Sequence, residues 1–312
     1  MGNSSCTATR IHSQAYTTAT PHHCHTAHPH EYQYRSWSSI LVKPPQTTQR
    51  IAICIEFDGH QFHGWQRQDN ASTAQGALEK ALSLIEGEHI TTICSGRTDS
   101  GVHGEAMLVH ADVSAARWLR SPKAYTQGLN QKLQAGIIAT GVRAVEADFH
   151  ARFSCLERTY RYQIWNRSTP SALSPWRHWW IPRTLNIDAM QTAAQQIIGE
   201  HDFTSFRAAN CQAHSPIRRI HQISLQQHDC DIQLTLSANG FLYHMVRNIV
   251  GSLVQVGTGR WQPDIMGTLL QQKNRSLAAA TAPAHGLYFI NAKYPDFNSR
   301  DLIGYESPNP SK

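Results

Sequence analysis

Apolar residues recur along this chain in two different periods, which separate its expected strands from its expected helices. The β-branched run at 51–57 ends at an Asp-Gly pair, which predicts a buried strand that enters a turn. Helical spacing of leucine and isoleucine predicts a helix over 73–86, with Thr73 as its cap and Gly87 as its end. By the same reasoning we expect further strands over 90–95, 105–111, 137–145, 158–165, 217–225, 231–236 and 286–290, and further helices over 122–133, 187–198, from within 241–251 to about 256, and over 264–272.

The order strand, helix, strand, strand occurs in both halves of the chain, although no residue-level repeat accompanies it. We therefore expect an N-terminal catalytic half over 50–147 and a C-terminal half over 148–296 that completes a cleft. Residues 1–49 are rich in Thr, Ser, Gln and His and lack an apolar period, which predicts a disordered extension. Residues 297–312 are expected to form a polar tail.

Composition limits the partners that this chain can take. Its 312 residues carry a formal net charge of +6, which favours a polyanionic partner, nucleic acid first. The longest apolar run is interrupted by Arg247 and Asn248 and falls short of the ~20 residues of a membrane helix, so no membrane insertion is expected. Seven scattered cysteines without a Cys-x-x-Cys motif indicate a reducing compartment. Cys211 and His214 have a metal-like spacing, but no second pair completes a tetrahedral site, so no metal is expected.

A glycine-rich loop over 94–104 contains the first candidate for chemistry. Its three glycines let the backbone turn sharply and approach a ligand, and Asp99 is its only acidic residue. Arg97 lies two positions earlier, close enough for a charge-assisted hydrogen bond that would keep Asp99 ionised. This combination suits a nucleophile or a base. The alternative is a polar connection in which Asp99 caps a turn.

Two further stretches place polar groups among apolar ones. In the strand over 158–165, Tyr160 and Tyr162 share one face, where they either bind a ligand or pack in the core. Arg247 interrupts an apolar helix, and such a cation either reaches solvent or pairs with a buried carboxylate, for which Asp99 is the candidate.

Seven stretches in the same order and spacing resemble one family. They are Gly96–Gly104, Phe57–Gly59 with Gly64–Gln68, Phe149–Phe153, Arg158–Tyr162, Asp202–Arg207, His244–Gly251 and Gly286–Tyr288. Together they are similar to the tRNA pseudouridine synthases that modify the anticodon stem and loop, the tRNA pseudouridine synthase A family. The likeness runs from about Arg50 to Pro295.

The resemblance implies both a fold and a reaction. The fold is α+β, a largely antiparallel mixed sheet flanked by helices, whose two similar halves form a central active-site cleft. The reaction is the isomerisation of uridine to pseudouridine at tRNA positions 38, 39 and 40, without metal or cofactor. Asp99 matches the family nucleophile, Arg97 the arginine that accompanies it, Tyr160 the tyrosine that packs against uracil, and Arg247 the arginine that pairs with the carboxylate.

The family also implies how the substrate is held. It works as a homodimer with tRNA lying across both subunits, and a cytoplasmic enzyme is expected. A solvated charged face is the alternative for any single surface arginine, whereas several together would follow an RNA backbone. The arginines chosen for phosphate contact are Arg67, Arg152, Arg207, Arg218 and Arg219.

Two other classes of protein stay open at this point. An RNA-binding module without catalysis would use the same strands, aromatic rings and arginines, but it needs no carboxylate at Asp99. A hydrolase of nucleosides or glycosides would also place a carboxylate at C1′, usually with a second carboxylate opposite, and the sequence offers no such partner in a comparable motif.

Overall fold

The computed structural model describes residues 47–305 of the 312. The expected disordered extension lies outside these residues except for its last three, and β1 already begins at Thr48. The last seven residues of the expected polar tail also lie outside the described range. Within residues 47–305 the strands form one mixed sheet, and loops and 3-10 turns connect them to the helices.

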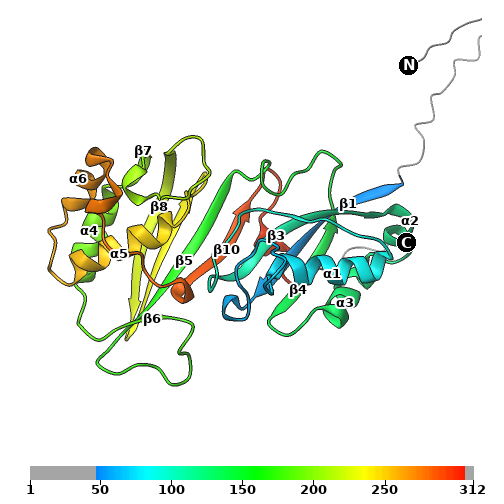
Figure 1. Cartoon of the computed structure of the whole chain (residues 1–312), viewed down its shortest axis with the longest axis horizontal. Helices are drawn as coiled ribbons and strands as arrows, with labels where there is room; N and C mark the ends of the chain where they lie inside the picture. Colours follow the sequence, from blue (N-terminus) through cyan, green and yellow to red (C-terminus); the bar gives the residue numbers. More distant parts are fainter. Residues whose placement is uncertain (1–46, 306–312) are drawn as a thin grey trace, which may run out of the picture. The chain divides into compact units, whose positions relative to one another are not determined.

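Ten strands form this sheet, in the order β4-β1-β3-β10-β5-β9-β8-β7, with β2 paired to β3 and β6 to β5 (Figure 1). Two pairs are parallel, β10 with β3 and β5 with β6, and the other pairs are antiparallel. The expected largely antiparallel mixed sheet is therefore confirmed. The strands are β1 Thr48–Phe57, β2 Ile93–Cys94, β3 His103–Ser114, β4 Ile137–Ala144, β5 Glu157–Asn166, β6 Trp179–Ile181, β7 Gly199–Asp202, β8 Ile217–His228, β9 Asp231–Ala238 and β10 Leu287–Lys293.

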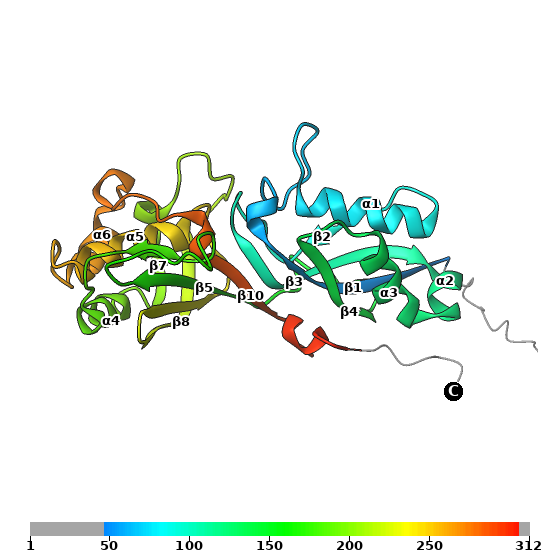
Figure 2. The same ribbon diagram turned by 90° about the horizontal axis from the view of Figure 1, so that it is seen from below.

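Six helices flank the sheet, in two groups. Helix α3 packs on β4 and on α1, while α4 packs on β8, α5 and α6. Figure 2 shows α1 above the strands of the N-terminal half and α5 above those of the C-terminal half. The helices are α1 Ala74–Glu86, α2 Ala115–Arg120, α3 Pro122–Lys132, α4 Ile187–Gln195, α5 Met245–Gly257 and α6 Ile265–Gln272. No helix in this part of the chain is both long and apolar enough to cross a membrane.

Local sequence chemistry explains the ends of α1. The hydroxyl of Thr73 accepts a hydrogen bond from the Gly76 amide, so it satisfies one of the free N–H groups at the helix start. Gly87 ends the helix in the left-handed region at φ 77°, which glycine adopts without a Cβ clash. Both predictions are confirmed.

The last strand of the chain joins the two halves of the sheet. Strand β10 pairs with β3 on one side, where Tyr288 lies opposite His103. On its other side β10 pairs with β5, where Phe289 lies opposite Tyr160. The Asp99 loop connects β2 to β3, so it ends at β3, the strand that borders this junction. The sheet therefore places the loop near the middle of its strand order.

Several elements differ from the sequence prediction. The strand expected over 90–95 is reduced to Ile93–Cys94, because the backbone of Thr92 donates to the carboxylate of Glu79 instead of to a neighbouring strand. The helix expected over 187–198 ends at Gln195. Three short elements, α2, β6 and β7, were not predicted, since six, three and four residues are too few to show a period.

Candidate active site

Close backbone packing positions the Asp99 loop. The amide of Trp65 donates to the carbonyl of Thr98 at 3.1 Å, which ties the loop to the segment after β1. Gly64 has φ +88°, and a Cβ there would lie 3.0 Å from that same carbonyl. A glycine is therefore required at this contact for its conformation and for its size.

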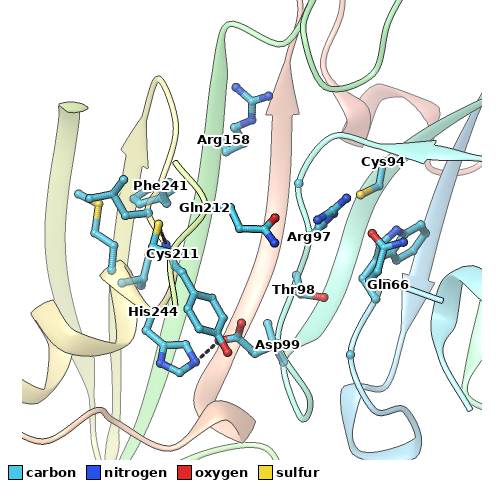
Figure 3. Close-up of a pocket in the computed structure, with 18 of the residues that line it drawn as sticks. Gln66, Cys94, Arg97, Thr98, Asp99, Arg158, Cys211, Gln212, Phe241 and His244 are labelled. Carbon is cyan, nitrogen blue, oxygen red and sulfur yellow. Dashed lines mark hydrogen bonds and ion pairs between the residues drawn. The ribbon is translucent and has the colours of Figure 1, made fainter. Parts of the chain in front are cut away.

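The carboxylate of Asp99 is held by two side chains from one end of α5. Arg247 Nη1 lies 2.9 Å from Asp99 Oδ2. His244 Nε2 lies 3.3 Å from the same oxygen (Figure 3). The α5 N-terminus adds the positive end of its dipole to this environment. The Asp99 side chain keeps 21% of its surface exposed, so the carboxylate is held but still reachable.

The predicted pairing of Arg247 with Asp99 is present. The Arg247 side chain is 14% exposed, and its Nε donates to the carbonyl of Ala282 at 2.8 Å. One guanidinium therefore satisfies a backbone carbonyl and the carboxylate together, which fixes both. This explains why a cation is tolerated in an otherwise apolar helix.

The hydrogen bond predicted between Arg97 and Asp99 does not occur among the described residues. Figure 3 shows the two side chains pointing to different parts of the pocket. Arg97 is exposed, while Asp99 turns toward α5. The prediction was wrong because Arg247, the other partner expected for Asp99, pairs with the carboxylate instead.

A large open pocket surrounds Asp99. Its volume is about 1320 Å³, more than the ~300–1,000 Å³ of a usual small-molecule site. In Figure 3 one wall carries Arg97 and Asp99, and the facing wall carries Phe241, Gln212 and His244. Among the described residues that line it, Asp99 is the only acidic one, and five are arginines: Arg97, Arg152, Arg158, Arg218 and Arg247. The pocket is therefore cationic apart from one carboxylate.

Tyr160 lies in this pocket, whereas Tyr162 does not. The Tyr160 ring packs edge to face against Phe241 at 5.1 Å and Phe289 at 5.2 Å, which fixes its plane. Burial, with Asp99 as the second cause, raises the pKa of the Tyr160 hydroxyl, so it stays protonated. Tyr162 is fully buried and donates to the carbonyl of Pro283 at 2.7 Å. Tyr162 thus packs in the core, while Tyr160 is also buried but lines the pocket, so its ligand-binding role stays a prediction.

The predicted phosphate-binding arginines fall into two groups. Arg152 and Arg218 line the pocket. The other three do not belong to its lining. Arg67 pairs with Glu79 at 3.3 Å and Arg219 with Glu200 at 3.4 Å. Arg207 donates to two backbone carbonyls, so it braces the loop that follows it.

Sequence reasoning missed two side chains of the site, and Arg158 is the first. Its guanidinium donates to the carbonyls of Ser95 at 3.1 Å, Cys155 at 3.0 Å and Asn239 at 2.9 Å. It therefore ties the start of the Asp99 loop to Asn239, the residue that follows strand β9 in the other half. Its place at the start of an alternating strand beside Tyr160 gave a signal, but the pattern does not distinguish it from a surface cation.

His244 is the second missed residue. It stands three positions before Arg247, which was the available signal, but its direction depends on a left-handed backbone that the sequence does not reveal. Burial is the main reason that the pKa of His244 lies below its ordinary value. Arg247 and Arg275 also lower this pKa, whereas Asp99 raises it.

The hydroxyl of Thr98 is a further polar group beside the carboxylate. Thr98 is 9% exposed and lines the pocket, and its Oγ1 has no hydrogen-bond partner within residues 47–305. Buried polar atoms in proteins are nearly always satisfied, so this oxygen is available to a bound molecule.

No group of three or more metal-ligating side chains occurs in the described part of the chain. Cys211, which had the metal-like spacing with His214, accepts a hydrogen bond from the Tyr243 amide at 3.4 Å.

Comparison with known proteins identifies the class first. The sequence profile of the family described as tRNA pseudouridine synthase matches residues 53–154 and 193–295. Asp99, His244 and Arg247 lie inside the matched segments, whereas Tyr160 lies between them.

Similar proteins identify the family more closely. A protein from Shewanella amazonensis, named tRNA pseudouridine synthase A, is 45% identical over 247 residues, which cover 79% of this chain and 94% of that protein. A protein of the same name from Escherichia coli is 46% identical over 249 residues, or 79% of this chain and 90% of that protein. The chain therefore belongs to the tRNA pseudouridine synthase A family and is an enzyme of the isomerase class.

Two solved structures also match at low similarity. They are a Cbf5-Nop10-Gar1 complex, with TM-score 0.34 over 77% of this chain and 48% of that one, and an archaeal box H/ACA sRNP Nop10-Cbf5 complex, with TM-score 0.32 over 81% and 53%. Both are 10% identical to this chain.

Proposed function

We propose that this enzyme isomerises uridine to pseudouridine in tRNA, at positions 38, 39 and 40 of the anticodon stem and loop. The observation that carries the proposal is the single carboxylate of Asp99, held by Arg247 in a pocket that five arginines line. Family membership supplies the reaction, and the geometry supplies a residue able to perform it.

The reaction rearranges one nucleotide without gain or loss of atoms. The C1′–N1 bond of uridine breaks, the uracil turns, and a C1′–C5 bond forms. C5 then loses its proton and N1 gains one. Asp99 is suited to stabilise or attack the electron-poor carbon, and its carboxylate is also able to accept a proton. Because the product is an isomer, the oxidation state is unchanged and the proposal assigns no cofactor.

Tyr160 and Arg97 are proposed to handle the base. A uridine must leave the helix stack before a side chain can reach its C1′. Tyr160 has a ring held in a fixed plane in the pocket, and stacking on such a ring is worth about 1–3 kcal/mol per base. Arg97 is exposed at the pocket wall, where it would fill the place that the uridine vacates.

The remaining arginines are proposed to bind the RNA backbone. Arg152 and Arg218 line the pocket, so they would contact phosphates next to the target uridine. Arg67 and Arg219 are about half exposed outside its lining and would contact phosphates farther away. Arg207 would act indirectly, by bracing the loop that follows it. The cytoplasmic homodimer expected from the family resemblance belongs to this proposal.

Incubation with an unmodified tRNA transcript tests the proposal. Carbodiimide mapping should reveal pseudouridine at positions 38 to 40 where uridine was present. Release of free uracil would instead indicate a hydrolase, and binding without product would indicate an RNA-binding module.

Substitution of the carboxylate tests its role. We expect Asp99→Ala to abolish turnover and to leave tRNA affinity within about tenfold, since the carboxylate contributes to chemistry more than to binding. Asp296→Ala, which removes an exposed acid outside the pocket lining, is the control and should behave like the wild type. Appreciable turnover by Asp99→Ala would refute the assignment.

A further inference from the structure

His244 contacts one particular oxygen of Asp99. Its Nε2 lies 3.3 Å from Oδ2, the oxygen that also receives Arg247 at 2.9 Å. The other oxygen, Oδ1, has no hydrogen bond or ion pair with any residue of the described range. The two carboxylate oxygens are therefore not equivalent, since one is held by protein and one is left for a substrate.

The backbone of His244 is in an uncommon conformation. It has φ 60° and ψ 4°, in the left-handed region that residues with a Cβ rarely adopt. The position immediately precedes α5, yet the His244 side chain makes no capping hydrogen bond with the helix. Strain of this kind persists where the surroundings impose it, and it is often found at functional sites.

Neighbouring groups explain where the imidazole points. The Tyr243 ring lies against it with the two centroids 4.0 Å apart, which limits the rotation of the imidazole. The left-handed residue turns the chain just before the first helical turn, which contains Arg247. Both side chains therefore reach Asp99 from the same end of α5.

The charges around His244 define its state at neutral pH. Asp99 from its loop favours the imidazolium, while Arg247 from α5 and Arg275 from the 3-10 turn Arg275–Leu277 oppose it. Burial is the largest effect and lowers the pKa of His244 further, which favours the neutral ring. A neutral ring with its proton on Nε2 lies 3.3 Å from Oδ2, so the contact does not require a second full charge beside Arg247.

We propose that His244 is a positioning residue that, together with Arg247, holds Oδ2 of Asp99 so that Oδ1 is the oxygen presented to the target uridine. This inference rests on the proposed function. It assigns to His244 a task that Arg247 cannot do alone, because one contact to Oδ2 leaves the carboxylate free to rotate about it.

Two substitutions at one position separate the imidazole from the backbone. Asn accepts the left-handed conformation readily, but its amide is too short to reach Asp99. Gln carries an amide nitrogen about as far from the backbone as Nε2 of histidine, so it can restore the contact. Asp229→Asn is the matched control, because Asp229 also has positive φ, 53°, but lies in the turn between β8 and β9.

The measurements are the single-turnover rate of pseudouridine formation with enzyme in excess, the Kd for tRNA and the melting temperature, all on the full chain. We expect His244→Asn to lower the rate at least about tenfold, with Kd within about threefold and a melting temperature equal to or above that of the wild type. His244→Gln should restore the rate to within about threefold of the wild type. Asp229→Asn should leave the rate unchanged.

Three results would overturn the inference: a wild-type rate for His244→Asn, equal losses for the Asn and Gln variants, or a loss of rate that accompanies a lower melting temperature. The last result would mean that His244 only supports the fold. If the wild type itself makes no pseudouridine, the proposed function fails. If the wild type is active and His244→Asn is equally active, only the positioning role fails.

Discussion

Asp99 and its neighbours show how a small set of contacts can prepare one carboxylate for reaction. Arg247 satisfies Oδ2 and a backbone carbonyl at once, while 21% of the Asp99 side chain stays exposed to the pocket. The guanidinium orients the carboxylate, and the pocket leaves it accessible. The proposed role of Asp99 requires both properties, since the carboxylate must be held in place and still touch a substrate.

Substitution of Arg247 should affect the reaction rate more than tRNA binding. Lysine keeps the charge but has a single nitrogen, which cannot reach Asp99 and the carbonyl of Ala282 in the geometry of the guanidinium. We expect Arg247→Lys to lower kcat about tenfold and Arg247→Gln to lower it more, since a hydrogen bond to a charged group is worth about 1.5–3 kcal/mol. Steady-state kinetics with tRNA checks this. Equal activity of Arg247→Lys and the wild type would show that the charge alone is sufficient.

Substitution of Tyr160 separates its ring from its hydroxyl. Phe keeps the flat face that Phe241 and Phe289 hold in place, whereas Ala removes it. We therefore expect Tyr160→Phe to lower the rate less than Tyr160→Ala does. If the two variants lose the same activity, the hydroxyl is the important group.

At the scale of elements, the segment after β1 packs closely against the Asp99 loop after β2 because Gly64, at their contact, has no side chain. A Cβ at Gly64 would come within 3.0 Å of the Thr98 carbonyl, next to Asp99 in sequence. The precision of the site thus depends on a residue that carries no functional group.

Gly64→Ala should damage both stability and catalysis. The matched control is Gly259→Ala, because Gly259 also has positive φ, +73°, but no atom within 4 Å of its Cβ position. We expect the control to lose about 1 kcal/mol of unfolding free energy with normal kcat, and Gly64→Ala to lose more and to have lower kcat. Denaturant unfolding and kinetics measure the two effects. Normal kcat in Gly64→Ala would mean that the loop does not depend on this contact.

The elements that could be predicted from sequence are those with a long period or a clear cap. Helix α1 is an example, because Thr73 and Gly87 bracket several turns of apolar residues. The strand expected over 90–95 was too long because the side chain of Glu79, distant in sequence, captures the Thr92 amide. The same limit applies in the site. Arg247 was found as a cation in an apolar helix, but His244 was missed, since its direction depends on a positive φ.

At the scale of the whole molecule, charge is arranged around the pocket. The chain carries a net charge of +6, and the pocket lining includes five arginines with a single acid. Cations that follow a phosphate backbone release counterions on binding, so affinity should fall steeply with salt.

Arg152→Ala should reduce this salt dependence. Arg152 is exposed and lines the pocket, whereas Arg260 is exposed at the far end of α5 and serves as the control. We expect Arg152→Ala to reduce the steepness of the slope of log K against log salt by about 1, the change for one lost phosphate contact. Arg260→Ala should leave the slope unchanged. Equal slopes for both variants would place the RNA elsewhere on the surface.

The central claim is that one carboxylate converts an N-glycosidic bond of uridine to a C-glycosidic one. The most direct measurement uses tRNA labelled with tritium at C5 of uridine, because the C5 proton leaves only when C5 becomes bonded to C1′. We predict that the wild type releases one tritium for each pseudouridine formed and no free uracil, while Asp99→Asn binds the tRNA and releases none. Tritium release by Asp99→Asn at a rate close to that of the wild type would contradict the account.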